Sequence, residues 1–419
     1  MDSTHTGSSV ADTAGTIHFE TARSTVSWTI EKSFNELEKI NLSLHQRPET
    51  AYQEFFAHET ITKFLQSRGF DVHCSAYGLE TCFEVEVGHG GRLVIFCAEY
   101  DALPDIGHAC GHNLIATSSL AAFLGAVEAL KQARRPGRIR LLGTPAEEGG
   151  GGKVKLIDAG AFPEEAAAAI MAHPVAYHQI MHGPGVYAGV ASLRFIASQK
   201  FRTEFHGRPA HAGCEPWKGI NALDAAVASY NCISMLRQQM AMDERVHAII
   251  EVGGTVQSVI PDYTRMSWNV RGPTIQRTEK LVEKVKACIE GAATASGCKL
   301  NYITVPMYAN LRANGTLCRN FVNDMENIGE KWLMDEEKPM TGSSDMGNVS
   351  HVIPSFHCGF AIPSEVGLHN PGFTAASGTA EAHEAALKCA KGMATLAIRV
   401  LFSDDVAEGA RLDFQRNDD

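Results

Sequence analysis

The chain has 419 residues, 44% of them hydrophobic and 20% charged, which suits two folded domains and excludes a largely disordered protein. Its net charge is −11 and it has no cluster of lysines and arginines, so nucleic acid is not an expected partner. The polar N-terminus lacks the apolar core of a signal peptide, and no apolar run of about 18 residues is present, so no membrane partner is expected.

The pattern of the first 190 residues predicts alternating strands and helices. A loose arm is expected over 1–25, with helices over 27–44 and 49–70 and strands over 82–88 and 92–100. A helix over 111–133 follows, then a strand that begins at Gly137 and runs into a glycine-dense loop, a short helix over 154–162 and a buried strand over 166–174. This order is the signature of an α/β fold with a mixed, largely parallel sheet and helices on both faces.

The pattern changes near Val190 and predicts a second, inserted domain. Its expected elements are strands over 192–207, 247–254, 265–274 and 299–305, and helices over 217–240 and 277–297. Their β-α-β-β-α-β order is the ferredoxin-like α+β pattern. The predicted domains are therefore 1–190, the inserted 191–305, and 306–419, which rejoins the first and ends in a helix over 381–402.

Side chains capable of chemistry gather where the predicted strands end. They are Cys110 with His112, Glu147 with Glu148, His173, His211 and His369. Thiolate, imidazole and carboxylate are the usual ligands of zinc and related ions, and two ions about 3.5–4 Å apart can hold both a water and a carbonyl. Adjacent glutamates suit such a site because one can bind metal while the other faces the water.

Each of these residues has an ordinary structural interpretation when taken alone. A histidine beside proline is usually structural, a glutamate pair is usually solvated, a lone cysteine is usually a buried thiol, and His211 by itself suits a turn cap. A structural zinc finger is disfavoured because the C-x-H pair has no second pair of ligands. A thiol nucleophile at Cys110, activated by His108 or His112, leaves the glutamates unexplained. The joint pattern favours a metal site.

Six stretches resemble, in order, the motifs of the dinuclear-metal peptidase and amidohydrolase family. They are EYDALPDIGHACGHNLIA, TPAEEGGGGKVKLIDAGAF, MAHP, FHGRPAHAGCEPWKGINALDA, GSSDMGNVSHVIPS and GLHNPGF. The family includes aminoacylases, carboxypeptidase G and indole-acetyl-amino-acid hydrolases. The chain is most similar to its Cys-x-His branch, and there to aminobenzoyl-glutamate hydrolases and Xaa-Arg or β-alanyl-lysine dipeptidases.

The resemblance implies a catalytic domain in the first and last segments and a lid and dimerisation domain between them. It implies five metal ligands, which are Cys110, His112, Glu148, His173 and His369. Glu147 is then the general base for attack by a metal-bound water, and Asp101 supports a ligand from behind. In the lid domain, His211 is expected to act in catalysis and substrate binding, and Arg271 to clamp a substrate carboxylate.

Three positions depart from the wider family. Glu99 stands where many members have the metal-binding histidine of an H-x-D-x-x-P motif, which is usual for the Cys-x-His branch. Asn113 stands where many relatives have aspartate. Ser258 stands where relatives usually have an asparagine that contacts substrate across the dimer, which predicts a shifted specificity.

The predicted function is metal-dependent hydrolysis of an amide bond in an N-acyl amino acid or dipeptide. Two divalent ions are expected as cofactors, with zinc preferred and manganese or cobalt as alternatives. A homodimer through the lid domain is expected. The eleven cysteines form no C-x-x-C pairs, which indicates reduced thiols and makes the cytoplasm the expected location. Two alternatives stay open: an enzyme of a biosynthetic pathway that processes or forms one specialised amide, and a non-catalytic binding protein on the same fold.

Overall fold

The computed structural model describes residues 10–180, 186–335 and 340–416, with side chains from Phe19 onward. The chain forms two compact units, each with its own core. The first unit comprises Met1–Arg194, Arg312–Pro339 and Val349–Asp419, and the second comprises Phe195–Leu311 and Met340–Asn348. The segment Met340–Asn348 joins the second unit because its backbone pairs with the residues that precede the first strand there, with Ile196 N–H donating to Gly342 O at 3.0 Å.

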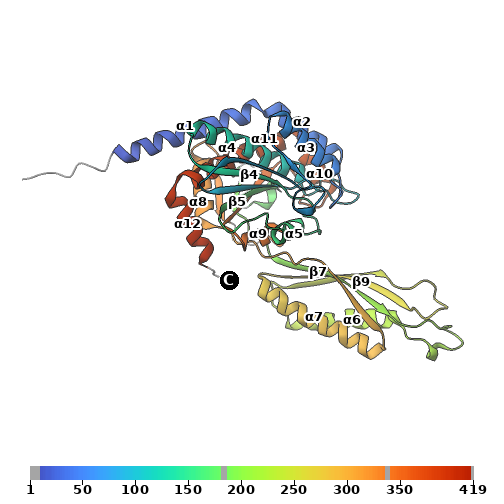
Figure 1. Ribbon diagram of the computed structural model, residues 1–419. Helices are drawn as coiled ribbons and strands as arrows, with labels where there is room; N and C mark the ends of the chain where they lie inside the picture. Colours follow the sequence, from blue (N-terminus) through green and yellow to red (C-terminus); the bar gives the residue numbers. More distant parts are fainter. Residues whose placement is uncertain (1–9, 181–185, 336–339, 417–419) are drawn as a thin grey trace, which may run out of the picture. The chain divides into compact units, whose positions relative to one another are not determined.

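A mixed eight-stranded sheet forms the centre of the first unit (Figure 1). Its strands, in spatial order, are β1 (His73–Cys74), β2 (Phe83–His89), β4 (Gly137–Gly143), β3 (Leu93–Ala98), β5 (Ala166–Ala176), β12 (Ser355–Ile362), β6 (Gly189–Ser192) and β11 (Trp332–Asp335). The four central strands β4, β3, β5 and β12 run parallel, so their carboxyl ends meet at one edge. Every residue of β3 and β12 is buried, so both faces of the sheet are covered there.

Two long helices pack side by side against the sheet. These are α4 (His112–Ala133) and α11 (Ala380–Phe402), which both contact β3 and β5. The other helices are α1 (Val10–Lys32), α2 (Phe34–Gln46), α3 (Phe55–Ser67), α5 (Gly152–Asp158), α8 (Gly315–Glu326), α9 (Met346–Ser350), α10 (Pro371–Ser377) and α12 (Asp404–Gln415), with 3-10 turns η1 (Ala76–Gly78) and η2 (Tyr177–Gln179). By length and composition α4 is apolar enough to cross a membrane, but 94% of its apolar stretch is buried inside the protein.

The N-terminal helices differ from the prediction. The single helix expected over 27–44 is wrong, because the chain turns at Ser33 between α1 and α2. The loose arm expected over 1–25 is wrong from Val10 onward, where α1 begins; residues 1–9 lie outside the described residues. Ala22 and Val26 of α1 are buried in the hydrophobic core that also contains residues of α4, so tertiary packing stabilises a helix that lacks a strong amphipathic pattern.

The second unit has the predicted ferredoxin-like arrangement. Its elements are β7 (Ala197–His206), η3 (Pro216–Lys218), α6 (Ala222–Leu236), η4 (Arg237–Gln239), β8 (Arg245–Val252), β9 (Tyr263–Gly272), α7 (Ile275–Ser296) and β10 (Lys299–Thr304). The four strands are antiparallel in the order β10-β7-β9-β8. Alternate residues of β9, such as Met266 and Trp268, are buried in the core that α6 and α7 cover. The predicted fold class, a largely parallel mixed sheet plus a separate α+β domain, is confirmed.

Candidate metal centre

The predicted ligands of the first unit come together at the carboxyl edge of its sheet. Cys110 precedes α4, and His112 is the first residue of that helix. Glu147 and Glu148 follow β4, and His173 lies near the end of β5. Because β4, β3 and β5 are parallel neighbours, residues that are distant in the sequence meet at this edge. The last predicted ligand, His369, is tied to the same place by its backbone N–H, which donates to Ala109 O at 2.8 Å.

The ligand atoms form three overlapping groups, two of which share the Cys110 thiol. Cys110, His112 and His173 make the first group, Cys110, Glu148 and His369 the second, and His112, Glu147 and Glu148 the third; within each group the ligand atoms lie within 4.8 Å of one another. The Cys110 Sγ is 3.4 Å from His173 Nε2, and Glu148 Oε1 is 3.2 Å from His369 Nε2. The two groups that share Cys110 would each be able to hold a divalent ion.

His112 is held with one ring nitrogen facing the other ligands. Its Nδ1 donates to Asp101 Oδ1 at 3.0 Å, and the whole side chain is buried. The Nε2 atom is also buried and forms no hydrogen bond within the described part of the chain. A buried imidazole nitrogen left open beside a thiol and carboxylates fits a metal ligand, since metal-bound histidines usually donate their other N–H to a carboxylate.

Asp101 braces two ligands at once. One carboxylate oxygen accepts from His112, and the other accepts from the backbone N–H of Glu148 at 2.8 Å. The side chain is buried and lies behind the ligands rather than among them. This placement is the supporting one that the sequence predicts for Asp101.

Burial and local charges set the ionisation of the ligands. Burial, reinforced by the charge of Glu148, raises the pKa of the Cys110 thiol well above its usual range. Burial lowers the pKa of His173 to about 3, so this imidazole is neutral and able to bind metal through Nε2 while Nδ1 donates to Pro174 O. Burial opposes ionisation of Glu148, but the hydrogen bond from His369 and the charge of His112 bring its pKa down to about 2.

These ionisation states separate the two interpretations of Cys110. A nucleophilic cysteine needs a lowered pKa, whereas this thiol is buried where the thiolate is disfavoured. A divalent cation removes that penalty, because metal binding displaces the thiol proton. His108, the proposed activating base, is also unsuitable: it is buried, its Nε2 bonds Leu44 O at 3.1 Å, and burial lowers its pKa to about 3. The geometry favours a ligand.

Glu147 and a buried ion pair complete the centre. Glu147 Oε2 lies 4.0 Å from His112 Nε2, and the side chain is only 6% exposed, so its carboxylate lies beside the ligands. Glu99 pairs with Lys153, and both are fully buried; the second oxygen of Glu99 is 3.7 Å from His112 Nε2. The buried pairing of Lys153 with Glu99 was not predicted from the sequence. The one indication there is that this lysine directly follows four glycines at the start of an apolar helix.

The other predicted site residues belong to the second unit. His211 Nδ1 accepts from the backbone N–H groups of Gly213 and Cys214, both at 3.1 Å, so its proton sits on Nε2. Ser258 is a close neighbour of His211, since its carbonyl accepts from Ala212 N–H at 2.9 Å. Arg271 donates to Thr341 O at 2.7 Å, and its buried Nε forms no hydrogen bond among the described residues. The roles of His211, Ser258 and Arg271 stay predictions.

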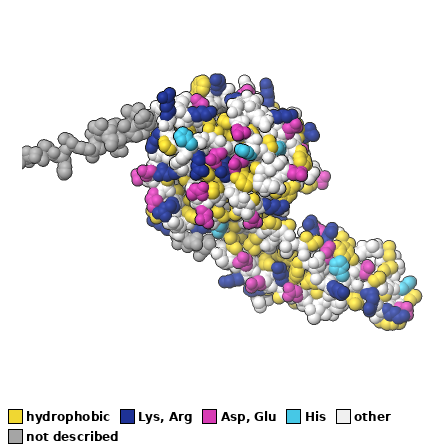
Figure 2. Space-filling model, viewed as in Figure 1, with side chains coloured by type: hydrophobic (Ala, Val, Ile, Leu, Met, Phe, Trp, Pro, Cys, Tyr) yellow, Lys and Arg dark blue, Asp and Glu magenta, His cyan; other side chains and the backbone are white. Residues whose placement is uncertain are grey.

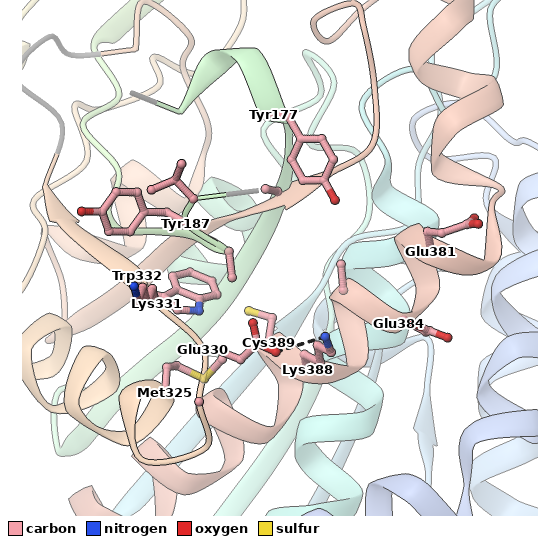
Figure 3. Close-up of a pocket in the computed structure, with 15 residues that line it drawn as sticks. Tyr177, Tyr187, Met325, Glu330, Lys331, Trp332, Glu381, Glu384, Lys388 and Cys389 are labelled. Atoms are coloured by element: carbon pink, nitrogen blue, oxygen red, sulfur yellow. Dashed lines mark ion pairs between the residues drawn. The ribbon is translucent and has the colours of Figure 1, made fainter. Parts of the chain in front are cut away.

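A separate pocket of about 590 Å³ lies elsewhere in the first unit (Figure 3). Tyr177, Tyr187 and Trp332 surround it, and an ion pair between Glu330 and Lys388 at 3.0 Å crosses its wall. The described residues that line it include none of the predicted metal ligands. This pocket is therefore not the predicted site.

Comparisons with known proteins point to one family. The pattern of Peptidase family M20/M25/M40 matches residues 95–393. The Xaa-Arg dipeptidase of Mus musculus is 36% identical over 404 residues, which cover 92% of this chain and 90% of that protein. A subunit of the p-aminobenzoyl-glutamate hydrolase of Escherichia coli (strain K12) is 30% identical over 264 residues, 59% of this chain and 53% of that protein.

A solved structure shares the fold. The dinuclear metal binding peptidase from the M20 family of Bacillus subtilis superposes with a TM-score of 0.64 and 22% sequence identity, covering 88% of this chain and 99% of that one. The resemblance drawn from the motifs is thus confirmed over most of the chain. The chain belongs to Peptidase family M20/M25/M40 and is a hydrolase of that family.

Proposed function

We propose that the protein hydrolyses the amide bond of a dipeptide or an N-acyl amino acid at a centre of two divalent ions. The observation that carries the proposal is the pair of ligand groups that share Cys110, with the Glu147 carboxylate beside them. Ions held there would supply Lewis acidity to a water and to the amide carbonyl. Thiolate and imidazole ligands favour zinc, and manganese and cobalt suit the mixed donor set as well.

The chain's own residues supply the proton transfers in this proposal. Glu147 takes the proton of the attacking water and passes it to the leaving nitrogen, which its buried position beside the ligands permits. His211 carries its proton on Nε2 because its Nδ1 is occupied by backbone donors. That N–H is a donor suited to the oxyanion that forms when water attacks the amide carbon.

Arg271 is the proposed recognition point for the substrate carboxylate. Burial lowers the pKa of its guanidinium, and no ion pair to it is present among the described residues. The Arg271 guanidinium is partly shielded from water and has no carboxylate partner among the described residues, so it is suited to bind an anionic ligand. Similar proteins are named Xaa-Arg dipeptidase and p-aminobenzoyl-glutamate hydrolase. An Xaa-Arg dipeptide and p-aminobenzoyl-glutamate each carry a free carboxylate, so both are candidate substrates for this chain.

A substrate panel tests the function and the clamp together. Metal-loaded protein is expected to hydrolyse at least one member of a panel of Xaa-Arg dipeptides, p-aminobenzoyl-glutamate and N-acetyl amino acids. Replacing the terminal carboxylate of that substrate with a carboxamide, or Arg271 with alanine, should each raise KM roughly 10- to 100-fold, as expected for a lost charged hydrogen bond. Combining both changes should add little further.

Two outcomes would contradict this assignment. Failure of every panel member with the zinc-, manganese- and cobalt-loaded protein counts against amide hydrolysis. Equal loss on acid and carboxamide substrates when Arg271 is replaced counts against the clamp alone.

We also propose that the second unit forms a homodimer. Its edge strand β8 exposes Ile249 (64%) and Ile250, and α6 exposes Tyr230 and Met235 (70%), an apolar surface that a second copy would cover. Hydrophobic side chains are visible on the surface of this unit in Figure 2. Light scattering is expected to give the dimer mass; a monomer mass at micromolar concentration would refute the proposal.

A cytoplasmic location is proposed as well. None of the eleven cysteines, which all lie among the described residues, forms a disulfide, and this suits a reducing compartment. Cell fractionation tests this, since recovery in a membrane or secreted fraction would contradict it.

A further inference from the structure

We infer that Glu54 is a positioning residue, which holds the turn that presents Glu147 to the metal centre. Glu54 lies in the loop before α3, far in sequence from every predicted ligand. The inference rests on the proposed function, because it takes Glu147 as the general base. It adds a residue that touches neither substrate nor metal and acts through the backbone.

The Glu54 carboxylate joins three parts of the first unit. Its Oε1 accepts from Tyr52 N–H at 2.9 Å and from Ala146 N–H at 2.8 Å, and its Oε2 accepts from the Thr81 hydroxyl at 2.8 Å. The side chain is fully buried. Both backbone partners donate to the same oxygen, and the Thr81 hydroxyl can donate to or accept from the other, so the carboxyl group satisfies all three contacts.

The backbone conformation of Ala146 explains why the turn needs the hydrogen bond to Glu54. Its φ angle is 59°, in the left-handed region that a residue with a Cβ rarely adopts. A residue persists there only when its surroundings over-determine the conformation. Ala146 directly precedes Glu147, so its dihedral angles set the direction in which the Glu147 carboxylate points. The bond from Ala146 N–H to Glu54 fixes the residue before Glu147, as the bond from Glu148 N–H to Asp101 fixes the residue after it.

A second contact from the same loop braces the far side of the turn. The Tyr52 hydroxyl donates to Gly150 O at 2.7 Å. A Cβ on Gly150 would lie 2.6 Å from the Ala146 Cβ and 2.9 Å from Tyr52 Cε2, so this glycine is required for the close packing. Tyr52 and Glu54 therefore hold the turn after β4 at both ends, and Glu147 lies between the two braces.

Ionising Glu54 costs free energy, because its carboxylate is buried and lies near another negative charge. Burial and the nearby charge of Asp101 raise the pKa of Glu54 to about 7. Glutamine is a poor test of these contacts, because its carbonyl oxygen can still accept from both backbone N–H groups while its NH₂ donates to the Thr81 oxygen. Leucine has a similar size and no acceptor, so Glu54→Leu removes all three hydrogen bonds.

The test compares Glu54→Leu with Glu49→Leu in the full-length, metal-loaded protein. Glu49 comes from the same loop, but among the described residues its carboxylate accepts only from Phe56 N–H and Ala57 N–H at the start of α3. Glu54→Leu is expected to lower kcat roughly 10- to 100-fold, the effect of a small misplacement of a catalytic group. KM and the metal content per chain should not change. Glu49→Leu should lower the melting temperature while kcat per folded, metal-loaded chain stays within about twofold.

The outcomes separate this inference from the function on which it rests. If Glu54→Leu keeps the kcat of Glu49→Leu while Glu147→Gln is inactive, Glu54 is structural and only this inference fails. If Glu147→Gln is itself active, the proposed function fails first. Should Glu54→Leu not fold, Thr81→Val removes one anchor of Glu54 without touching the turn. It is expected to lower kcat roughly fivefold, and an unchanged kcat would overturn the inference.

Discussion

Replacing Glu147 with glutamine is expected to lower kcat by roughly 10²- to 10⁴-fold, the usual contribution of a general base. The amide cannot take a proton from water, yet it keeps the size of the carboxylate beside His112. Glu147 does lie in a third group with His112 and Glu148, but the two groups that share Cys110 do not include it, so metal content should stay at the wild-type level. Steady-state kinetics on the substrate found with the panel, together with metal analysis of the same sample, measure both quantities.

The neighbouring glutamate supplies the control for this experiment. Glu148 belongs to the group with Cys110 and His369, and its ionised carboxylate lies 3.2 Å from the His369 ring. Glu148→Gln is therefore expected to lose metal as well as activity, and excess metal should restore part of the activity. Near-normal turnover by Glu147→Gln, or equal metal loss in both variants, would show that the two roles have been assigned wrongly.

The sheet edge and its ligands were predictable because the signals are local. Each ligand stretch follows a short apolar run that predicts a buried strand, and parallel strands bring their carboxyl ends together. Cys110 and His112 are two residues apart, and Glu147 and Glu148 are adjacent, so the pairs are visible without any knowledge of the fold. His369 was also a candidate from the sequence alone, but the strand that precedes it, β12, was not among the predicted elements.

The supporting contacts were not predictable, because their partners are distant in the sequence. Glu54 and Ala146 are 92 residues apart, and Lys153 and Glu99 are 54 apart. A buried charge has no local signature; it is recognised only when its partner is in place. The same reason explains Asp101, whose role became specific only when its two oxygens were seen to accept from His112 and from Glu148.

Replacing Cys110 with alanine is expected to reduce metal content from about two ions per chain to less than one, and to abolish hydrolysis. The reason is geometric, because Cys110 is the residue that the group with His173 and the group with His369 have in common. His369→Ala removes a ligand from a single group, so it should keep the ion held by His112 and His173. Metal analysis after dialysis against a weak chelator, with activity measured before and after metal is restored, compares the two variants.

The same comparison decides between a ligand and a nucleophile at this position. A nucleophilic thiol predicts that Cys110→Ala loses all activity and keeps its metal, because catalysis and binding would then be separate. A ligand that belongs to two groups predicts the joint loss of activity and metal, with a smaller metal loss in His369→Ala. The burial that raises the pKa of Cys110 favours the second result, since only a bound cation makes the thiolate stable there. Full metal content in Cys110→Ala would therefore refute the two-metal centre proposed for this chain.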